Sequence, residues 1–277
     1  MPEIITGNFA PLRLAIWPPS SLRIVDWNID RGQQLQGVID FLASTNADIL
    51  SLQEVDLNAR RTHHLNVGEE IARKLQMNYV FGREFQELVQ GSKNDPAYHG
   101  QATLARWPIS NPRLIRFSRQ SNFWRPHWFL PKIEPFQERL GGRIALVAEI
   151  NVAGSKLLIY NLHLESRGND ELRFSQIEEV LSDAARQDSQ RSIVIAGDFN
   201  LDASKGSVAS AFAATGFQDA IAAPRPTTPS RRLLEPGSRI DWAFVRGSVR
   251  PGLGRVHNQI RASDHYPISF TLNSSRR

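Results

Sequence analysis

The sequence contains no cysteine, which excludes disulfides, cysteine-ligated zinc and a thiol nucleophile. It also has no apolar run near the roughly 18 residues that a membrane helix needs, so we predict no transmembrane segment. The start, MPEIITGNFAPLRLAIWPPSS, lacks the basic, apolar and small-residue regions of a signal peptide. These absences favour a cytoplasmic protein, and export without a disulfide stays open.

Lysine is scarce, because only 5 of the 33 basic residues are Lys and 28 are Arg. Arginine binds phosphate in a bidentate manner, and the net charge of +5 favours a polyanionic partner. Codon usage in a GC-rich genome would produce the same bias, and composition does not separate the two explanations. We expect a monomer.

Apolar strands alternate with helical segments, and no composition shift marks a linker. We therefore predict one domain over residues 1–277, with a core from about 22 to 272. The many strands and few long helices predict two packed sheets with helices outside. Predicted strands cover 22–29, 48–55, 101–109, 143–152, 156–164, 192–198, 239–245 and 265–272. Predicted helices cover 34–47, 68–77, 169–187 and about 207–214.

Two segments interrupt this alternation. Leu57–Val67 is polar, with paired Arg and paired His, and Ser118–Gly142 mixes five bulky aromatics with basic residues. A long irregular segment in a compact domain is usually functional or disordered, and its aromatics argue against disorder. The second segment could stack nucleic-acid bases, form a satellite apolar cluster beneath a loop, or touch an anionic membrane.

Polar side chains follow the predicted strands. Alternate residues of an extended chain share one face, and this spacing gives three pairs: Asn28 with Asp30, Asn161 with His163, and Asp198 with Asn200. Further strand ends carry Glu54, Asp241, Asp264 and His265. Buried carboxylates are costly unless they meet a cation, a donor or water. We therefore predict a polar pocket where these strand ends meet.

Each residue also has an ordinary structural interpretation. Asp198 and Asn200 favour Asx-turns, and Asp241 could pair with Arg239. Glu54 alone would be a strand-end acid, and a single histidine is usually a satisfied core or surface residue. Their joint occurrence after so many apolar runs favours a site.

Five motifs carry a resemblance to a known family: WNID, LQEV, NLHLES, AGDFN, and SRIDWAF followed by SDHYP. Their order resembles the endonuclease/exonuclease/phosphatase superfamily of deoxyribonuclease-I-like, metal-dependent phosphoesterases. YHGQATLARWPI is similar to that family's Gly-x-Ala-x-Leu-Ser-Arg-x-Pro-Ile strand, with Ala105 in place of Ser. The resemblance implies an α/β fold, a four-layer α/β/β/α sandwich of two mixed sheets, and phosphoester hydrolysis with Mg²⁺, or Mn²⁺, as cofactor.

The resemblance also implies roles for single residues. Metal-binding roles fall on Glu54 as the principal ligand and on Asn28, Asp30 and Asp264, although some branches lack the acid at Asp30. Catalytic roles fall on His265 with its partner Asp241, on Asp198 and Asn200 beside the attacking water, and on the phosphate-contacting His163. Either Asp198 or the His265–Asp241 pair could accept the water's proton.

The substrate is less defined, because one fold serves many reactions. WNID with HLESRG resembles the tyrosyl-DNA phosphodiesterase branch, which implies nucleic acid and DNA repair. The basic charge and the aromatic segment also favour nucleic acid. Candidate substrate-binding residues are Trp124, Arg125, Trp128, Tyr98 and His99. The alternatives are a lipid or inositol-phosphate phosphoesterase, such as a sphingomyelinase, and, more remotely, a non-catalytic binding module.

Overall fold

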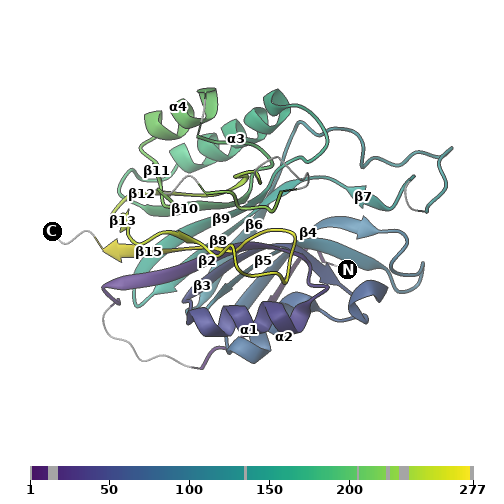
Figure 1. The fold of residues 1–277 in the computed structure, drawn as a ribbon, viewed down its shortest axis with the longest axis horizontal. Helices are drawn as coiled ribbons and strands as arrows, with labels where there is room; N and C mark the ends of the chain where they lie inside the picture. The colour runs from purple at the N-terminus through teal and green to yellow at the C-terminus, as the bar shows by residue number, and fades with distance from the viewer. Residues whose placement is uncertain are drawn as a thin grey trace.

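The computed structural model describes residues 2–11, 18–133, 136–204, 206–222, 225–230 and 237–274. Two β-sheets pack face to face, with α1 and α2 on the outside of one sheet and α3 and α4 on the outside of the other (Figure 1). The predicted α/β/β/α sandwich is therefore confirmed.

The first sheet has nine strands among the described residues, in the order β1-β4-β5-β3-β2-β15-β13, with β14 beside β15 and β7 beside β4. Strands β2 and β3 run parallel, and α1 (Leu35–Thr45) and α2 (Val67–Leu75) follow them. The strand bounds are β1 Ile4–Gly7, β2 Ser21–Arg31, β3 Ile49–Leu57, β4 Asn78–Glu87, β5 Ala97–Ala105, β7 Arg139–Gly141, β13 Val249–Pro251, β14 Arg255–Val256 and β15 Ile268–Ser274.

The second sheet has six strands among the described residues, in the order β11-β12-β10-β9-β8-β6. Strands β9 and β10 run parallel, with α3 (Asp170–Ala185) between them in sequence and α4 (Gly206–Ala214) after β10. The strand bounds are β6 Ile109–Arg116, β8 Ile144–Val152, β9 Ser155–His163, β10 Ser192–Asp198, β11 Gln218–Asp219 and β12 Asp241–Arg246.

Strand β2 shows how the core is divided. Val25, Trp27 and Ile29 belong to the apolar cluster under α1 and α2, whereas Ile24 belongs to the cluster between the sheets. Since side chains alternate across a strand, Asp26 and Asn28 also face the second sheet. The inter-sheet layer is therefore apolar at the start of β2 and polar at its end.

A hydrogen-bonded bridge joins the sheets in this polar region. The Gln53 side chain on β3 donates to Asn161 Oδ1 on β9 at 2.9 Å and to Asp26 Oδ1 at 2.8 Å. Asn161 Nδ2 donates in return to the carbonyls of Leu52, at 3.1 Å, and Ala102, at 3.0 Å. Asn161 and Gln53 are fully buried, so these bonds fix how the sheets align.

The predicted helices are all present, with ends that differ by a few residues. Asn169 caps α3, because its side chain accepts the Leu172 backbone N–H at 3.0 Å. The strand predicted at 101–109 is wrong as one element: β5 ends at Ala105 and β6 begins at Ile109, because the chain turns before Pro108, which cannot donate to a ladder. No described helix is both long and apolar enough to cross a membrane.

Further differences concern two strands and the two irregular segments. The sequence pattern missed β4, and β15 begins at Ile268, so that His265 lies in the loop before it. The segment 57–67 holds a short 3₁₀ helix at Arg60–Thr62, and the segment 118–142 contains β7.

Leu146 on β8 tests the inter-sheet packing. It is fully buried, and a Cβ atom built on Gly82 of β4 would lie 3.1 Å from its Cδ1. We expect Leu146→Ala to lower the free energy of unfolding by about 2–5 kcal/mol. Leu253→Ala, at a leucine that is 76% exposed, should change it by less than about 0.5 kcal/mol. Urea unfolding measures both, and equal midpoints would contradict this packing.

Candidate active site

The predicted site residues gather around one cavity of about 450 Å³. Six of the predicted catalytic and metal-binding residues line it: Glu54, His163, Asp198, Asn200, Asp264 and His265. Two more, Asn28 and Asp241, are buried behind the lining and hydrogen-bonded to it. Both sheets contribute, because Glu54 lies on β3 of the first sheet while His163 and Asp198 end β9 and β10 of the second.

Irregular pairing in the first sheet aims its side chains at the cavity. The register between β2 and β3 shifts at Asn28–Arg31, and that between β3 and β5 shifts at Leu52–Val55. Glu54 has a φ of 51° and Asp30 a φ of 44°, a left-handed conformation that costs a non-glycine residue about 1–3 kcal/mol. Bulges of this kind often redirect a side chain beside an active site, and here the Glu54 side chain, 18% exposed, reaches the cavity.

Gly197 sets the position of Asp198. Its φ is +145°, and a Cβ there would lie 2.0 Å from the Leu162 carbonyl oxygen. Only glycine therefore lets β10 approach β9 this closely. Asp198 Oδ1 accepts the Asn200 backbone N–H at 2.9 Å, and Oδ2 accepts Asn28 Nδ2 at 3.2 Å. Asp198 thus makes an Asx-turn bond and also lines the cavity.

His265 and Asp241 form a buried pair. His265 Nδ1 lies 2.9 Å from Asp241 Oδ2, and Nε2 lies 3.7 Å from Asp198 Oδ2. Arg239 pairs with Asp219 at 2.7 Å, so it does not take Asp241 as its partner. Burial acts to lower the pKa of His265, but the charges of Asp241 and then Asp198 outweigh it and raise the pKa to about 10. The ring is therefore an imidazolium at neutral pH, in which Nδ1 donates to Asp241 and Nε2 also carries a proton.

The acids on the first sheet's side of the cavity fit a hard cation. Burial acts to raise the pKa of Glu54, but the charge of the Arg31 guanidinium outweighs it and holds that pKa well below its usual value. Glu54 is thus ionised, and Asp264 lines the same cavity. Carboxylate oxygens are the ligands that Mg²⁺ prefers, usually one or two of them.

The other two predicted metal ligands are engaged elsewhere. Asn28 donates to Asp198, and its Oδ1 accepts the Asp30 backbone N–H at 3.1 Å. Asp30 pairs with Arg31, whose Nη1 also lies 3.6 Å from Glu54 Oε2. In this arrangement Asn28 supports Asp198, and Arg31 lies between two of the acids.

Four arginines also line the cavity: Arg31, Arg139, Arg143 and Arg167. Arg143 donates to the buried Glu84 at 2.8 Å, and Arg139 pairs with Glu87 at 3.2 Å. The sequence did not single these out, because arginine occurs throughout the chain. The only available signal was the position of Arg167 directly after the HLES motif.

The candidate substrate-binding residues are scattered. Tyr98 and His99 are buried in the first sheet, Tyr98 under the Arg83 guanidinium. Trp124 touches the cavity, but it is buried and donates to Glu165 at 3.2 Å, as the apolar-cluster interpretation predicts. Arg125 and Trp128 do not line the cavity. They belong to the segment between β6 and β7, whose described part projects from the body (Figure 1), and Trp128 is 95% exposed.

Comparisons with known proteins agree with this architecture. Residues 27–265 match the model of the Endonuclease/Exonuclease/phosphatase family. Human tyrosyl-DNA phosphodiesterase 2 is 24% identical over 189 residues, which cover 66% of this chain but only 42% of the human protein.

Solved structures share the fold. An endonuclease/exonuclease/phosphatase protein from Beutenbergia cavernae DSM 12333 superposes with a TM-score of 0.68 at 18% identity, covering 92% of this chain and 72% of the other. D. rerio TDP2 complexed with a single-strand DNA product gives a TM-score of 0.61 at 20% identity, covering 92% and 100%. On this family match, which spans most of the chain, the chain belongs to the Endonuclease/Exonuclease/phosphatase family.

Proposed function

We propose that the chain is a Mg²⁺-dependent phosphodiesterase that acts on a nucleic-acid strand, in the manner of a nuclease or a tyrosyl-DNA phosphodiesterase. The observation that carries this proposal is a second groove, of about 650 Å³, that shares Arg167 with the catalytic cavity. A substrate that extends from the cavity into this groove would be a chain of phosphates rather than a single small ester.

The groove has the chemistry that single strands need. Its lining includes Arg119, Arg125 and the half-exposed Phe123. The Arg167 guanidinium stacks on the Phe123 ring at 4.7 Å, at the junction of groove and cavity. Cationic side chains follow a phosphate backbone while aromatic rings stack against bases.

The relatives support the same substrate class. The matching human protein is named for tyrosyl-DNA, and one similar structure holds a single-strand DNA product. This chain spans less than half of the human protein's length, so that protein's activity does not transfer to it directly. We therefore include DNA-end processing only as part of the proposed function.

The geometry suits in-line attack by water. Asp198 is held by Asn28 and by the Asn200 N–H, and we assign it to orient the water and accept its proton. The His265 imidazolium, fixed by Asp241, would donate to an oxygen that gains negative charge. Glu54 with Asp264 would hold Mg²⁺, which neutralises phosphate charge when bound.

Asp198→Asn should lower kcat by about 10²–10⁴-fold, because the amide cannot accept a proton. The fold should persist, as measured by circular dichroism. Asp202→Asn is the matched control: Asp202 is exposed, and its carboxylate accepts the Ser204 backbone N–H at 3.1 Å in the next loop. Near-wild-type hydrolysis by Asp198→Asn would refute the site assignment, whereas loss in both variants would point to a general disturbance of the loop.

Removal of divalent metal should abolish hydrolysis. Exhaustive dialysis against EDTA should eliminate turnover of bis-p-nitrophenyl phosphate, and added Mg²⁺ or Mn²⁺ should restore it. Glu54→Gln should raise the Mg²⁺ concentration for half-maximal rate, since a neutral amide binds a hard cation weakly. Full activity after chelation would rule out the proposed metal dependence.

Arg125→Ala tests the substrate class, because Arg125 is exposed and lines the groove but not the cavity. Loss of one charged phosphate contact costs about 1.5–3 kcal/mol, so KM for a single-stranded oligonucleotide should rise at least about tenfold. The KM for bis-p-nitrophenyl phosphate should change far less, because this small diester does not reach the groove. Arg250→Ala, at an exposed strand residue, is the control. Equal effects on both substrates would count against an extended polyanion.

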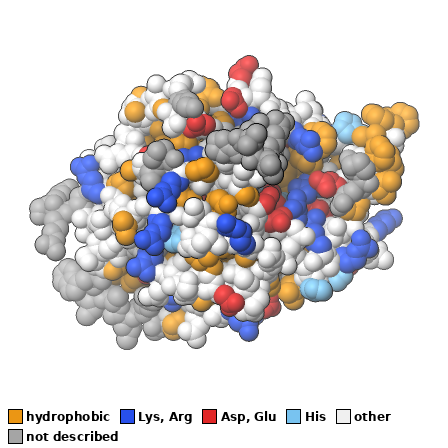
Figure 2. All heavy atoms as spheres, viewed as in Figure 1, with side chains coloured by type: hydrophobic (Ala, Val, Ile, Leu, Met, Phe, Trp, Pro, Cys, Tyr) orange, Lys and Arg blue, Asp and Glu red, His pale blue; other side chains and the backbone are white. Residues whose placement is uncertain are grey.

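A lipid phosphodiesterase is the second candidate. Figure 2 shows hydrophobic side chains gathered at one end of the molecule. In the segment between β6 and β7, Trp128 is 95% and Phe129 64% exposed. Exposed aromatics beside cations suit a membrane surface. Hydrolysis of sphingomyelin vesicles, with no cleavage of DNA or RNA in the same assay panel, would establish this candidate instead.

A further inference from the structure

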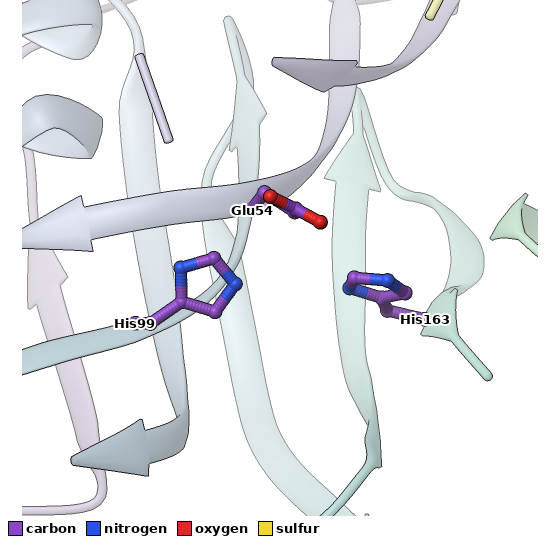
Figure 3. A group of neighbouring side chains, drawn as sticks. All are labelled: Glu54, His99 and His163. Carbon is purple, nitrogen blue, oxygen red and sulfur yellow. The ribbon is translucent and has the colours of Figure 1, made fainter. Parts of the chain in front are cut away.

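Three side chains from three strands meet at the edge of the cavity: two of them line it, and the third, His99, is buried beside them. Glu54 comes from β3, His99 from β5 and His163 from β9, and one potential ligand atom of each lies within 4.8 Å of the other two. In Figure 3 the two imidazole rings flank the Glu54 carboxylate. This cluster has two nitrogen donors and one oxygen donor, unlike the all-oxygen set proposed above for Mg²⁺.

His99 is the residue that the proposed hydrolysis leaves unexplained. Its side chain is fully buried, and Nδ1 lies 3.3 Å from Asp56 Oδ1. Asp56 is ionised and fixed by Arg61, whose Nε and Nη2 donate to its two oxygens at 2.7 Å each. The Asp56 carboxylate therefore favours the tautomer of His99 that carries its proton on Nδ1. In this tautomer Nε2 has a lone pair that can bind a metal ion. That Nε2 is buried without a hydrogen-bond partner, a cost that proteins rarely accept without a ligand.

His163 also has a carboxylate near Nδ1, although this nitrogen makes no hydrogen bond. Its Nδ1 faces Glu84 Oε2 at 3.5 Å, and Glu84 is held by Arg143 at 2.8 Å. Its Nε2 is turned towards Asp198, 3.6 Å away. Histidines that bind metal almost always direct their second nitrogen at a carboxylate, a carbonyl or water, which fixes the tautomer. Both imidazoles here have that carboxylate.

We propose that Glu54, His99 and His163 form a binding site for a borderline divalent transition ion, best matched by Zn²⁺. Two histidines and one glutamate with an open fourth position are an established zinc ligand set, and imidazole selects transition ions over Mg²⁺. Two ligands on one zinc lie at most about 4.2 Å apart, given bonds of about 2.1 Å. The three ligand atoms, which lie within 4.8 Å of one another, are therefore already close to that spacing.

The shared Glu54 gives the site a consequence. An ion held by the two histidines occupies the carboxylate that would hold Mg²⁺, so the two metals compete. It also engages His163, which would otherwise contact phosphate. Zn²⁺ should therefore inhibit Mg²⁺-dependent hydrolysis; this consequence rests on the proposed function, whereas metal binding itself does not.

Cobalt titration of metal-free protein tests the binding site. Co²⁺ replaces Zn²⁺ and reports nitrogen ligation through its visible absorption. We expect one equivalent to bind wild type, and His99→Phe to weaken binding by at least about tenfold. His257→Phe is the control, since His257 is a half-buried histidine that lines a different pocket and contacts Ser269 at 2.8 Å. An unchanged spectrum and affinity in His99→Phe would overturn the proposal.

A second measurement does not depend on how the variant folds. In wild type, long-range ¹H–¹⁵N spectra should show Zn²⁺ shifting the imidazole signals of His99 and His163 but not that of His257. Shifts confined to other histidines, or no binding of Zn²⁺ at all, would refute the site. If Zn²⁺ binds as described but the protein hydrolyses no phosphodiester with Mg²⁺, the proposed function fails while this inference stands.

Discussion

The bond between Gln53 and Asn161 is the contact on which the site depends. It joins β3 to β9 through the middle of the sandwich, where each partner is cut off from water. The next residue after Gln53 is Glu54, and two residues beyond Asn161 is His163. A slip between the sheets would leave buried amides unpaired, so the same bond that aligns the sheets keeps the carboxylate of one sheet opposite the imidazole of the other.

Around this bridge, the buried charged side chains form pairs of opposite charge. Glu84 lies against Arg143, Asp56 against Arg61, and Asp241 against His265. Breaking one member of such a pair is costly, because the other remains as an uncompensated buried charge. The cavity walls are therefore rigid supports for the side chains that face its interior, which is the condition for electrostatic stabilisation of a transition state.

Much of this molecule could be predicted from the sequence. The apolar runs gave the sandwich, and alternate spacing correctly placed Asn161 and His163 on the inter-sheet face. What local patterns could not supply were features that arise between distant segments. Strand β4 was missed, and with it Glu84 beneath His163. The bulge at Glu54 was also hidden, because a register shift depends on the partner strand rather than on the residues of LQEV.

His99 was noticed only as a substitute for another catalytic position. Its burial between Asp56 and Glu54 depends on the pairing of β5 with β3, which no spacing within YHGQ expresses. The aromatic segment divided in a similar way: Trp124 packs inward against Phe85, while Trp128 faces outward. Side chains only four residues apart in an irregular loop have no fixed relation, since no helix or strand period applies.

Gly197 has no side chain, yet the carboxylate beside it depends on it. With the Leu162 carbonyl oxygen 2.0 Å from where a Cβ would stand, any other residue would push β10 away from β9 and carry Asp198 with it. A substitution at Gly197 would therefore reduce activity as if a catalytic group had been removed, although every catalytic side chain was still present. Gly197, the glycine of AGDFN, allows β10 to lie close to β9, and this close approach sets the position of the Asp198 carboxylate.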